Sequence, residues 1–501
     1  MNSLLKLTSS KEVSIKKAAT ACIAASTELA EIHVEMRRRD LLETIVSLLA
    51  TQEPPEVQDE AAFTIANLAK DFALKADIRK AGGVKALVKL LPSTDPDVKK
   101  NVALALSSLL EDFTNRSEIR YVNGLAPLLE LLGADFPEIQ ENTLMSLILS
   151  AEDQANRVEI RKLNGVKRLI DMLSQDLPEL HQWTLICLSK CLEDCETVNI
   201  FPEIGGLPPI IKMLASEDIR NKKNASLVIS KVAKTERNQA FIRDAGAVPI
   251  LIASLNHADF GVVSHAAMAM GHLAKNEITQ LELNKLGLVE VLVKLTGHED
   301  VEICRHATFA LSSLCLNAKA RLKVKTTESI GAIMRLLTLE DPQTLVNASD
   351  CIANLAEDTP NRLDIVKSGG VAALLSILNK LLNYHLSAKY WLRNELSPEN
   401  IIKTGFYDLG SAGANLDQIK GLPTLHELKS IPVDKRREVL CIDFDKDTHL
   451  NLLCQAANQQ LATLTPRQQI VKFLPSSVTL WEAQSNQLPS PNSSSSLKSQ
   501  S

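Results

Sequence analysis

Apolar residues recur along most of this chain in short phrases that are copied at a fixed interval. Residues 82–91 form one such phrase, GGVKALVKLL, whose apolar positions are spaced as on one face of a helix. From Gly82 onward, each step from one copy to the next is 41 residues. The copies begin at residues 40, 82, 123, 164, 205, 246, 287, 328 and 369. A catalytic motif occurs once, so a phrase repeated at a constant period indicates an array of stacked repeats.

Each period of 41 residues predicts three helices. A column of Asn and Thr predicts the start of a short first helix, because these side chains accept backbone N–H groups at helix N-termini. That column is Asn115, Asn156, Thr197, Asn238, Thr279 and Asn361. The phrase itself predicts a second helix. A loop then leads to a third helix such as 96–112, where Pro96 suits the first turn and the apolar residues share one face.

The end of each first helix is predicted by residues that tolerate a left-handed backbone conformation. These residues are Gly82, Asn123, Asn164, Gly205, Gly246, Gly287 and Gly369. Glu328 interrupts the column, so a distorted turn is expected there. No single repeat can bury its apolar faces alone, and stacking therefore predicts one continuous core.

Composition agrees with a helical protein and excludes several functional classes. Hydrophobic residues make up 45% of the chain and aromatic residues only 4%, which suits helices packed through Leu, Ile, Val and Ala. A net charge of −5 gives no general attraction to nucleic acid or anionic lipid. The nine scattered cysteines are typical of buried side chains in a reducing compartment. No apolar run approaches the ~18–20 residues of a membrane span, so we expect a cytoplasmic protein, with nuclear access or ciliary association left open.

The repeat unit resembles the armadillo repeat. The best-matching segments are EAAFTIANLAKD at 60–71 and SDCIANLAED at 349–358, and the resemblance covers about residues 1–396. It implies an all-α, right-handed armadillo solenoid of about nine three-helix repeats. The stretch LSPENIIKTGFYDLG at 396–410 resembles the segment after the repeats in ankyrin and armadillo repeat-containing proteins, although the ankyrin signature TPLHxA does not occur.

Four parts of the chain are expected. They are a truncated repeat at 1–27, the solenoid at 28–396, a mixed capping segment at 397–483 and a disordered Ser-rich tail at 484–501. The chain begins inside a second helix, which leaves Leu4, Leu5 and Leu7 partly uncovered unless upstream sequence or a partner covers them. We therefore expect a C-terminal portion or a short isoform of a longer protein.

The resemblance implies that third helices line a concave groove. In the family, each third helix carries a Trp and, four residues later, an Asn that binds the backbone of an extended peptide. Here the Asn column is Asn67, Ser108, Leu149, Lys190, Lys231, His272, Ser313, Asn354 and Asn394. The Trp column contains no Trp, which argues against a nuclear-localisation-signal receptor.

A further polar column lies on the same stripe of the third helices, and it contains four Asn and two His. Unpaired polar groups are costly to bury, so these side chains predict a polar groove floor. The candidate groove residues are Asn67, Asn101, Asn142, Trp183, Lys190, Asn224, Lys231, His265, His272, His306, Asn347, Asn354 and Asn394. The alternative is that the asparagines are structural and bond a neighbouring loop or the preceding helix.

Charge in the middle of the predicted groove is basic. Lys190, Lys231 and His272 occupy successive repeats, with Lys222 and Lys223 nearby. A basic strip in an acidic protein favours a partner with acidic residues. Ordinary surface charge is an equally good interpretation.

Motifs with possible chemistry are incomplete. Cys187, Cys191 and Cys195 lie on one helical stripe, but no further ligand completes a zinc site, so core packing is expected. The run VLCIDFDKDT at 439–448 resembles the start of a haloacid-dehalogenase phosphatase, yet Asp447 stands where that motif has Thr or Val. We therefore expect no enzyme activity, no cofactor and no metal.

The main functional hypothesis is a non-catalytic scaffold that holds an extended peptide or helix of another protein in the armadillo groove. A second hypothesis is a structural solenoid of a ciliary, axonemal or vesicle-associated assembly that binds through its ends or convex face. A nuclear-transport adaptor is less favoured, because its Trp–Asn array is mostly missing. Neither nucleic acid, membrane insertion nor a small-molecule substrate is expected.

Overall fold

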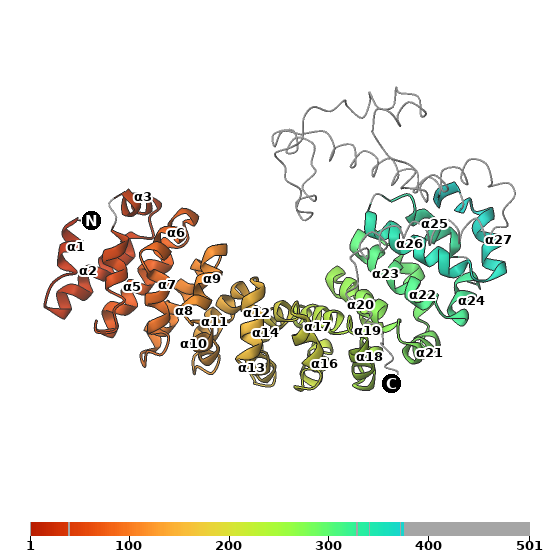
Figure 1. Cartoon of the computed structure of the whole chain (residues 1–501), viewed down its shortest axis with the longest axis horizontal. Coiled ribbons are helices and arrows are strands. Elements are labelled where there is room, and N and C mark those ends of the chain that lie inside the picture. Colours follow the sequence, from red (N-terminus) through yellow and green to blue (C-terminus); the bar gives the residue numbers. More distant parts are fainter. Residues whose placement is uncertain (1, 39–40, 327–328, 340, 371, 375–501) are drawn as a thin grey trace, which may run out of the picture. The chain divides into compact units, whose positions relative to one another are not determined.

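The computed structural model describes residues 2–38, 41–326, 329–339, 341–370 and 372–374. All regular secondary structure in these residues is helical, and it includes helices α1 to α27 (Figure 1). The prediction of an all-α protein built from three-helix repeats is confirmed for this part of the chain.

The three helices of each repeat recur in the predicted order. The first helices are α3 (Ala30–Arg38), α6 (Phe72–Lys80), α9 (Phe113–Tyr121), α12 (Gln154–Lys162), α15 (Cys195–Ile200), α18 (Glu236–Asp244), α21 (Glu277–Lys285), α24 (Ala318–Thr326) and α27 (Thr359–Lys367). The second helices are α1 (Asn2–Leu7), α4 (Leu42–Ser47), α7 (Gly83–Leu90), α10 (Leu125–Leu131), α13 (Gly165–Met172), α16 (Leu207–Leu214), α19 (Ala247–Ser254), α22 (Leu288–Leu295) and α25 (Ile330–Leu336). The third helices are α2 (Val13–Ser26), α5 (Pro55–Leu68), α8 (Pro96–Leu109), α11 (Pro137–Ser150), α14 (Pro178–Cys191), α17 (Ile219–Val232), α20 (Phe260–Leu273), α23 (Val301–Leu314) and α26 (Pro342–Leu355).

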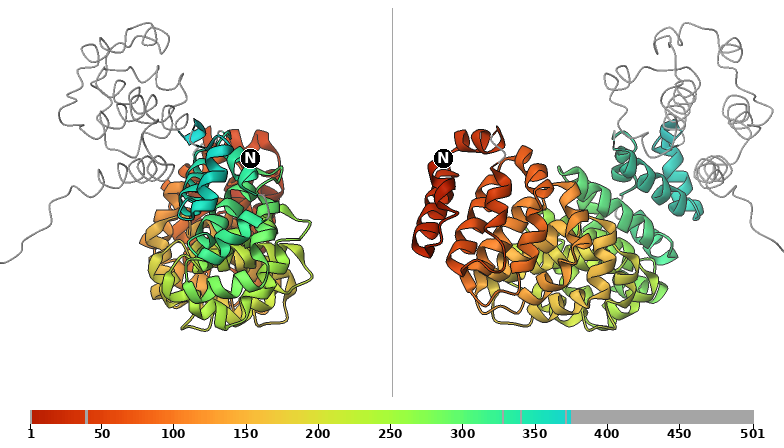
Figure 2. Two further views of the ribbon diagram at one scale, coloured as in Figure 1. Left: turned by 90° about the vertical axis from the view of Figure 1, so that its right-hand side faces the viewer. Right: turned by 60° about the vertical axis from the view of Figure 1, so that its left-hand side comes forward.

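The chain forms two compact units, Met1–Leu288 and Val289–Ser501. In the first unit, each third helix from α2 to α20 packs against the next third helix, so that these helices form one continuous layer (Figures 1 and 2). In the second unit, α23 packs against α26 in the same way. The core between the helices is aliphatic. The third residue of successive third helices, for example, is Val57, Val98, Ile139 and Leu180, each no more than 2% exposed.

Helix ends follow the residue types that the sequence places there. Pro96 opens α8, and the Asp95 side chain accepts hydrogen bonds from the N–H groups of Asp97 and Val98. The predicted left-handed residues have positive φ, with Gly82 at 84° and Asn164 at 57°. Glu328, where we expect a distorted turn, lies outside the described residues.

The predicted start of the first helices is wrong by three residues. In α9 the N-cap is Asp112, whose carboxylate accepts from the N–H groups of Thr114 and Asn115. Asn115 is the third residue of the helix and is completely buried. The aspartate satisfies the free N–H groups from outside the helix, so the asparagine three residues later can turn inward.

The inward asparagines join consecutive repeats. Asn156 Nδ2 donates to Ser150 O at the end of α11 (3.0 Å) and to Arg116 O of the preceding first helix (2.7 Å). Asn238 repeats this arrangement with Val232 O (3.3 Å) and Val198 O (2.7 Å). We call the column Asn115, Asn156, Asn238 and Asn361 the seam asparagines. Asn115, Asn156 and Asn238 donate to carbonyl groups at the C-termini of third helices, which have no partner within the helix. Asn361 donates to Arg321 O of the preceding first helix (3.4 Å).

Candidate functional site

The candidate site lies on the exposed side of the third-helix layer in the first unit. Positions 2, 5, 6, 9 and 13 of each third helix share one face, since successive residues turn by about 100°. We call the face formed by these positions in α5 to α20 the third-helix surface. Position 9 carries an apolar side chain in every one of these helices, and each is half-buried: Phe63, Leu104, Met145, Ile186, Leu227 and Met268. An apolar strip with one side chain from each helix therefore follows this surface.

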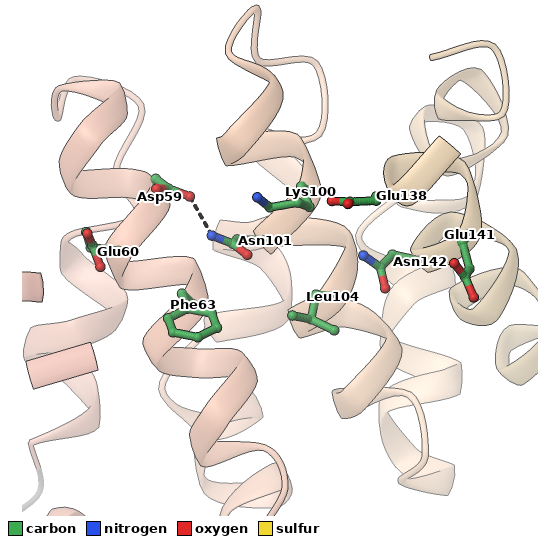
Figure 3. A pocket seen from close by; sticks show the side chains of 9 residues that line it. All are labelled: Asp59, Glu60, Phe63, Lys100, Asn101, Leu104, Glu138, Glu141 and Asn142. Atoms are coloured by element: carbon green, nitrogen blue, oxygen red, sulfur yellow. Dashed lines mark hydrogen bonds between the residues drawn. The ribbon is translucent and has the colours of Figure 1, made fainter. Parts of the chain in front are cut away.

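A hollow opens on this surface where α5, α8 and α11 lie side by side (Figure 3). Its volume is about 570 Å³. The lining residues are Asp59, Glu60, Phe63, Lys100, Asn101, Leu104, Glu138, Glu141 and Asn142. Four carboxylates thus face one ammonium group. Phe63 and Leu104 form the apolar part of the lining on adjacent helices.

Partial burial shapes the electrostatics of the hollow. Burial raises the pKa of the Asp59 carboxyl, although a hydrogen bond from Asn101 Nδ2 to Asp59 Oδ1 (2.5 Å) opposes the shift. Burial also raises the pKa of Glu60, and the charge of Asp59 adds to the effect. A pKa raised in this way means that the ionised carboxylates are short of solvation, so a cation placed beside them is favoured.

Among the predicted groove asparagines and histidines, five bond to the preceding third helix. Asn67, which is 1% exposed, donates to Ala24 O (3.4 Å). Asn101 bonds Asp59 as described, and His265 Nδ1 lies 3.2 Å from Lys223 O. In the second unit, Asn347 donates to Arg305 O (3.1 Å) and Asn354 to Ser312 O (3.0 Å).

The bonds of Asn101 and Asn347 match the structural alternative, in which asparagines of the polar column bond a neighbouring loop or the preceding helix. Asn67 and Asn354, from the Asn column, and His265 also bond the preceding helix. Asn67 and Asn347 are moreover buried, at 1% and 6% exposure, and so they do not form an exposed groove floor. Their amides are satisfied within the protein because a polar side chain in a packed layer must find a partner there.

Three other predicted residues remain open on the third-helix surface. Asn142, Trp183 and Asn224 are half-buried, and none makes a side-chain hydrogen bond to any other residue in the described part of the chain. His272 in the first unit and His306 in the second unit are also half-buried at their predicted helical positions. Asn394 lies outside the described residues.

The two central lysines are ion-paired. Lys190 Nζ lies 2.7 Å from Glu152 Oε1, and its hydrogen bond lowers the pKa of the Glu152 carboxyl. Lys231 Nζ lies 3.2 Å from Glu193 Oε1 and 2.7 Å from Ser189 O, while burial lowers the pKa of Lys231. Both lysines therefore have acidic partners on the preceding repeat.

The cysteine stripe forms no site in the described residues. Cys187 and Cys191 are buried, and a mutual hydrogen bond together with burial raises the pKa of the Cys187 thiol. Cys195 is exposed. No group of three or more His, Cys, Asp or Glu side chains in the described residues is arranged to hold a metal ion. No described helix is long and apolar enough to span a membrane.

Comparisons with known proteins agree with this architecture. Residues 72–111 and 235–275 match the family model of the armadillo/β-catenin-like repeat. This chain contains armadillo repeats. The crystal structure of an engineered protein from the Northeast Structural Genomics Consortium is similar at 29% identity and a TM-score of 0.69, over 75% of this chain and 93% of that chain. A designed armadillo repeat protein is similar at 21% identity and a TM-score of 0.45, over 46% of this chain and 99% of that chain.

A second family model matches the C-terminal part of the armadillo-containing chain. Residues 382–495 match a model described as EDR1/CTR1/ARMC3, peptidase-like, which does not by itself establish catalysis. The match lies outside the described residues and includes 396–410, so the narrower resemblance to ankyrin and armadillo repeat-containing proteins stays a prediction. The same holds for the predicted capping segment at 397–483 and tail at 484–501. A search of curated proteins found no match.

Sequence analysis missed the acidic hollow. The signal was present, because the second, fifth and sixth positions of α5, α8 and α11 are rich in Asp and Glu. Each helix contributes only a few of these charges, whereas the hollow combines several positions of three neighbouring helices. Only the packing of these helices brings Asp59, Lys100 and Glu141 together.

Proposed function

We propose that this protein is a non-catalytic scaffold whose third-helix surface binds an extended segment of a partner protein. Armadillo repeats commonly mediate protein–protein binding, which supports a protein partner in general. The single observation that carries the finer proposal is the half-buried apolar strip from Phe63 to Met268, which stays partly exposed in six successive third helices. Covering such a strip is favourable in proportion to the apolar area removed from water.

The spacing of the repeats suits an extended chain. Packed helices lie roughly 8–10 Å apart, and an extended chain advances about 3.3 Å per residue. Each repeat therefore meets roughly three residues of a bound segment. The open side chains of Asn142 and Asn224, two repeats apart, are placed to donate hydrogen bonds to its backbone.

A phage-displayed library of 12-residue peptides, selected on the purified chain, tests this proposal. Leu104→Gln with Met145→Gln should abolish enrichment, because the apolar strip is interrupted where it leaves the hollow. Tyr121→Gln is the matched control, since Tyr121 is 74% exposed on the first helix α9 and lies off the third-helix surface. Equal enrichment of the same peptides on the double variant and on wild type would refute the proposal.

The proposal assigns no catalytic step to the chain, and the peptidase-like match makes this worth testing. We expect the purified chain to leave fluorescently labelled casein intact, at a rate equal to the buffer blank. Casein cleavage above the buffer blank would overturn this expectation. We also propose a cytoplasmic location, which cell fractionation of the tagged chain can test.

A further inference from the structure

The charge of the third-helix surface changes sign along the first unit. On α11, positions 2 and 5 are Glu138 and Glu141, and both are exposed. On α17, two repeats further on, the same two positions are Arg220 and Lys223, again both exposed. Identical helical positions thus carry opposite charges at two places that the same apolar strip connects.

These charges are largely available to a partner. Glu138 and Glu141 form no ion pair within the described residues, and neither does Lys223. Arg220 has one carboxylate partner, Asp218, which precedes α17 in the adjacent loop (3.0 Å). At the acidic end, Asp59 and Glu60 add two further carboxylates, and Lys100 is the only basic residue that lines the hollow.

We infer that the bound segment is itself of mixed charge, with Lys or Arg over the hollow at α5 to α11 and Asp or Glu over α17. This inference rests on the proposed function. The last helix of the hollow, α11, lies two repeats from α17. Two repeats span roughly 16–20 Å, which an extended chain covers with about five or six residues. The partner's basic and acidic groups are therefore separated by about that number of residues.

The sign change also fixes how the segment is placed. A partner with this charge order gains attraction at both ends in one alignment, while the opposite alignment sets like charges against each other. Electrostatic complementarity of this kind contributes mainly to specificity and to the rate of association. The apolar strip supplies affinity, and the charges select which half of the segment lies on which repeats.

Fluorescence anisotropy with synthetic peptides tests the inference on the full chain. The probe is a fluorescein-labelled peptide with three Arg, a neutral spacer of five residues that includes Leu and Val, and three Glu. The same peptide with the two charged blocks exchanged shows which chain direction is bound, and a peptide with Arg in both blocks is the control. We expect the better of the two mixed peptides to bind at least about tenfold more tightly than the all-basic peptide at low salt.

Charge-reversal variants sharpen the test. Glu138→Lys with Glu141→Lys, or Arg220→Glu with Lys223→Glu, should each weaken the preferred mixed peptide about tenfold or more. Combining all four substitutions should shift the preference to the peptide with exchanged blocks. All four positions are exposed, so we expect circular dichroism to show an unchanged helical signal.

Two outcomes separate failure of the inference from failure of the proposed function. Equal binding of the all-basic and mixed peptides, or no effect of Arg220→Glu with Lys223→Glu, would overturn the mixed-charge inference and leave the scaffold proposal intact. Full binding of the mixed peptide by the Leu104→Gln, Met145→Gln variant would instead overturn the scaffold proposal.

Discussion

The first helices and the third helices both carry a repeated asparagine column, but the two columns meet different surroundings. The seam asparagines of the first helices are at most 1% exposed, and Asn115, Asn156 and Asn238 each bond carbonyl groups of two different helices. On the third helices, the sixth position ranges from Asn347, which is 6% exposed and bonded, to Asn142 and Asn224, which are half-buried and unbonded among the described residues. The same residue type at the same period therefore stabilises the stack in one place and leaves a polar surface open in the other.

Replacing a seam asparagine should have the largest effect on stability. Asn156→Ala removes the two hydrogen bonds that the Asn156 amide donates. It also removes the Oδ1 atom that accepts a hydrogen bond from Arg120 Nη1 (2.7 Å). We expect a loss of about 2–3 kcal/mol, because buried carbonyls lose their donors. Urea denaturation, monitored by circular dichroism, measures the change in the free energy of unfolding. The control is Gln154→Ala, which replaces an exposed residue of the same helix. A shift no larger than that of the control would contradict the role of the seam.

Replacing the buried amide of Asn221 should have the next largest effect on stability, and this change should stabilise the protein. Asn221 occupies the third position of α17, where other third helices have Val57, Val98 or Ile139, and its Oδ1 is buried with no hydrogen-bond partner among the described residues. Asn221→Val should stabilise the protein by about 1–2 kcal/mol, because the cost of burying the amide disappears. The thermal midpoint measures the gain.

The reverse change provides the matched control for Asn221. Val98→Asn places an amide at the equivalent fully buried position in α8 and should lower the thermal midpoint. Destabilisation by Asn221→Val would show that this asparagine has a partner that the structure does not reveal.

An ion pair between third helices in the second unit should have a smaller, pH-dependent effect. Arg305 hydrogen bonds lower the pKa of Asp341, the N-cap of α26, from 3.8 to about 2. The carboxylate therefore stabilises the folded state above about pH 4, and this contribution is lost as the pH falls towards 2. Asp341→Asn keeps a capping side chain but removes the charge, so we expect a loss of about 1 kcal/mol at pH 7.

The pH dependence distinguishes the charge of Asp341 from its capping role. The difference in urea midpoint between wild type and Asp341→Asn should be constant from pH 7 to 5 and should shrink between pH 4 and 3. A difference that does not change with pH would indicate that the variant acts through capping alone.

The smallest stability effects are expected on the third-helix surface. Asn142→Ala and Asn224→Ala should each change stability by no more than about 0.5 kcal/mol, since neither amide bonds another described residue. The same denaturation assay compares them directly with Asn156→Ala. A loss of 2 kcal/mol or more in either variant would remove the distinction between the two asparagine columns.

Much of the fold was predictable from the sequence because its signals are local. The 41-residue period, the Pro96 start of α8 and the left-handed turns at Gly82 and Asn164 are each set by a few neighbouring residues. The start of the first helices was harder to predict. Asp112 and Asn115 are both good capping residues, and the choice depends on Leu109 O and Lys75 O, which only the packed repeats place beside Asn115.

The candidate site was predicted only in part. The sequence placed the candidate residues Asn142, Trp183 and Asn224 on the third helices, and their role in binding stays a prediction. The pairing of Lys190 with Glu152 and of Lys231 with Glu193 was not, because each pair joins residues 38 positions apart. The acidic hollow was missed for the same reason.

By itself, the sequence determined the helices, their caps and the repeat, because backbone preferences and apolar periodicity act over a few residues. The tertiary structure decided which polar side chains form hydrogen bonds inside the stack and which remain open on the surface. That outcome depends on the distance between atoms about forty residues apart, where a nearby carbonyl converts an asparagine from a surface group into part of the core.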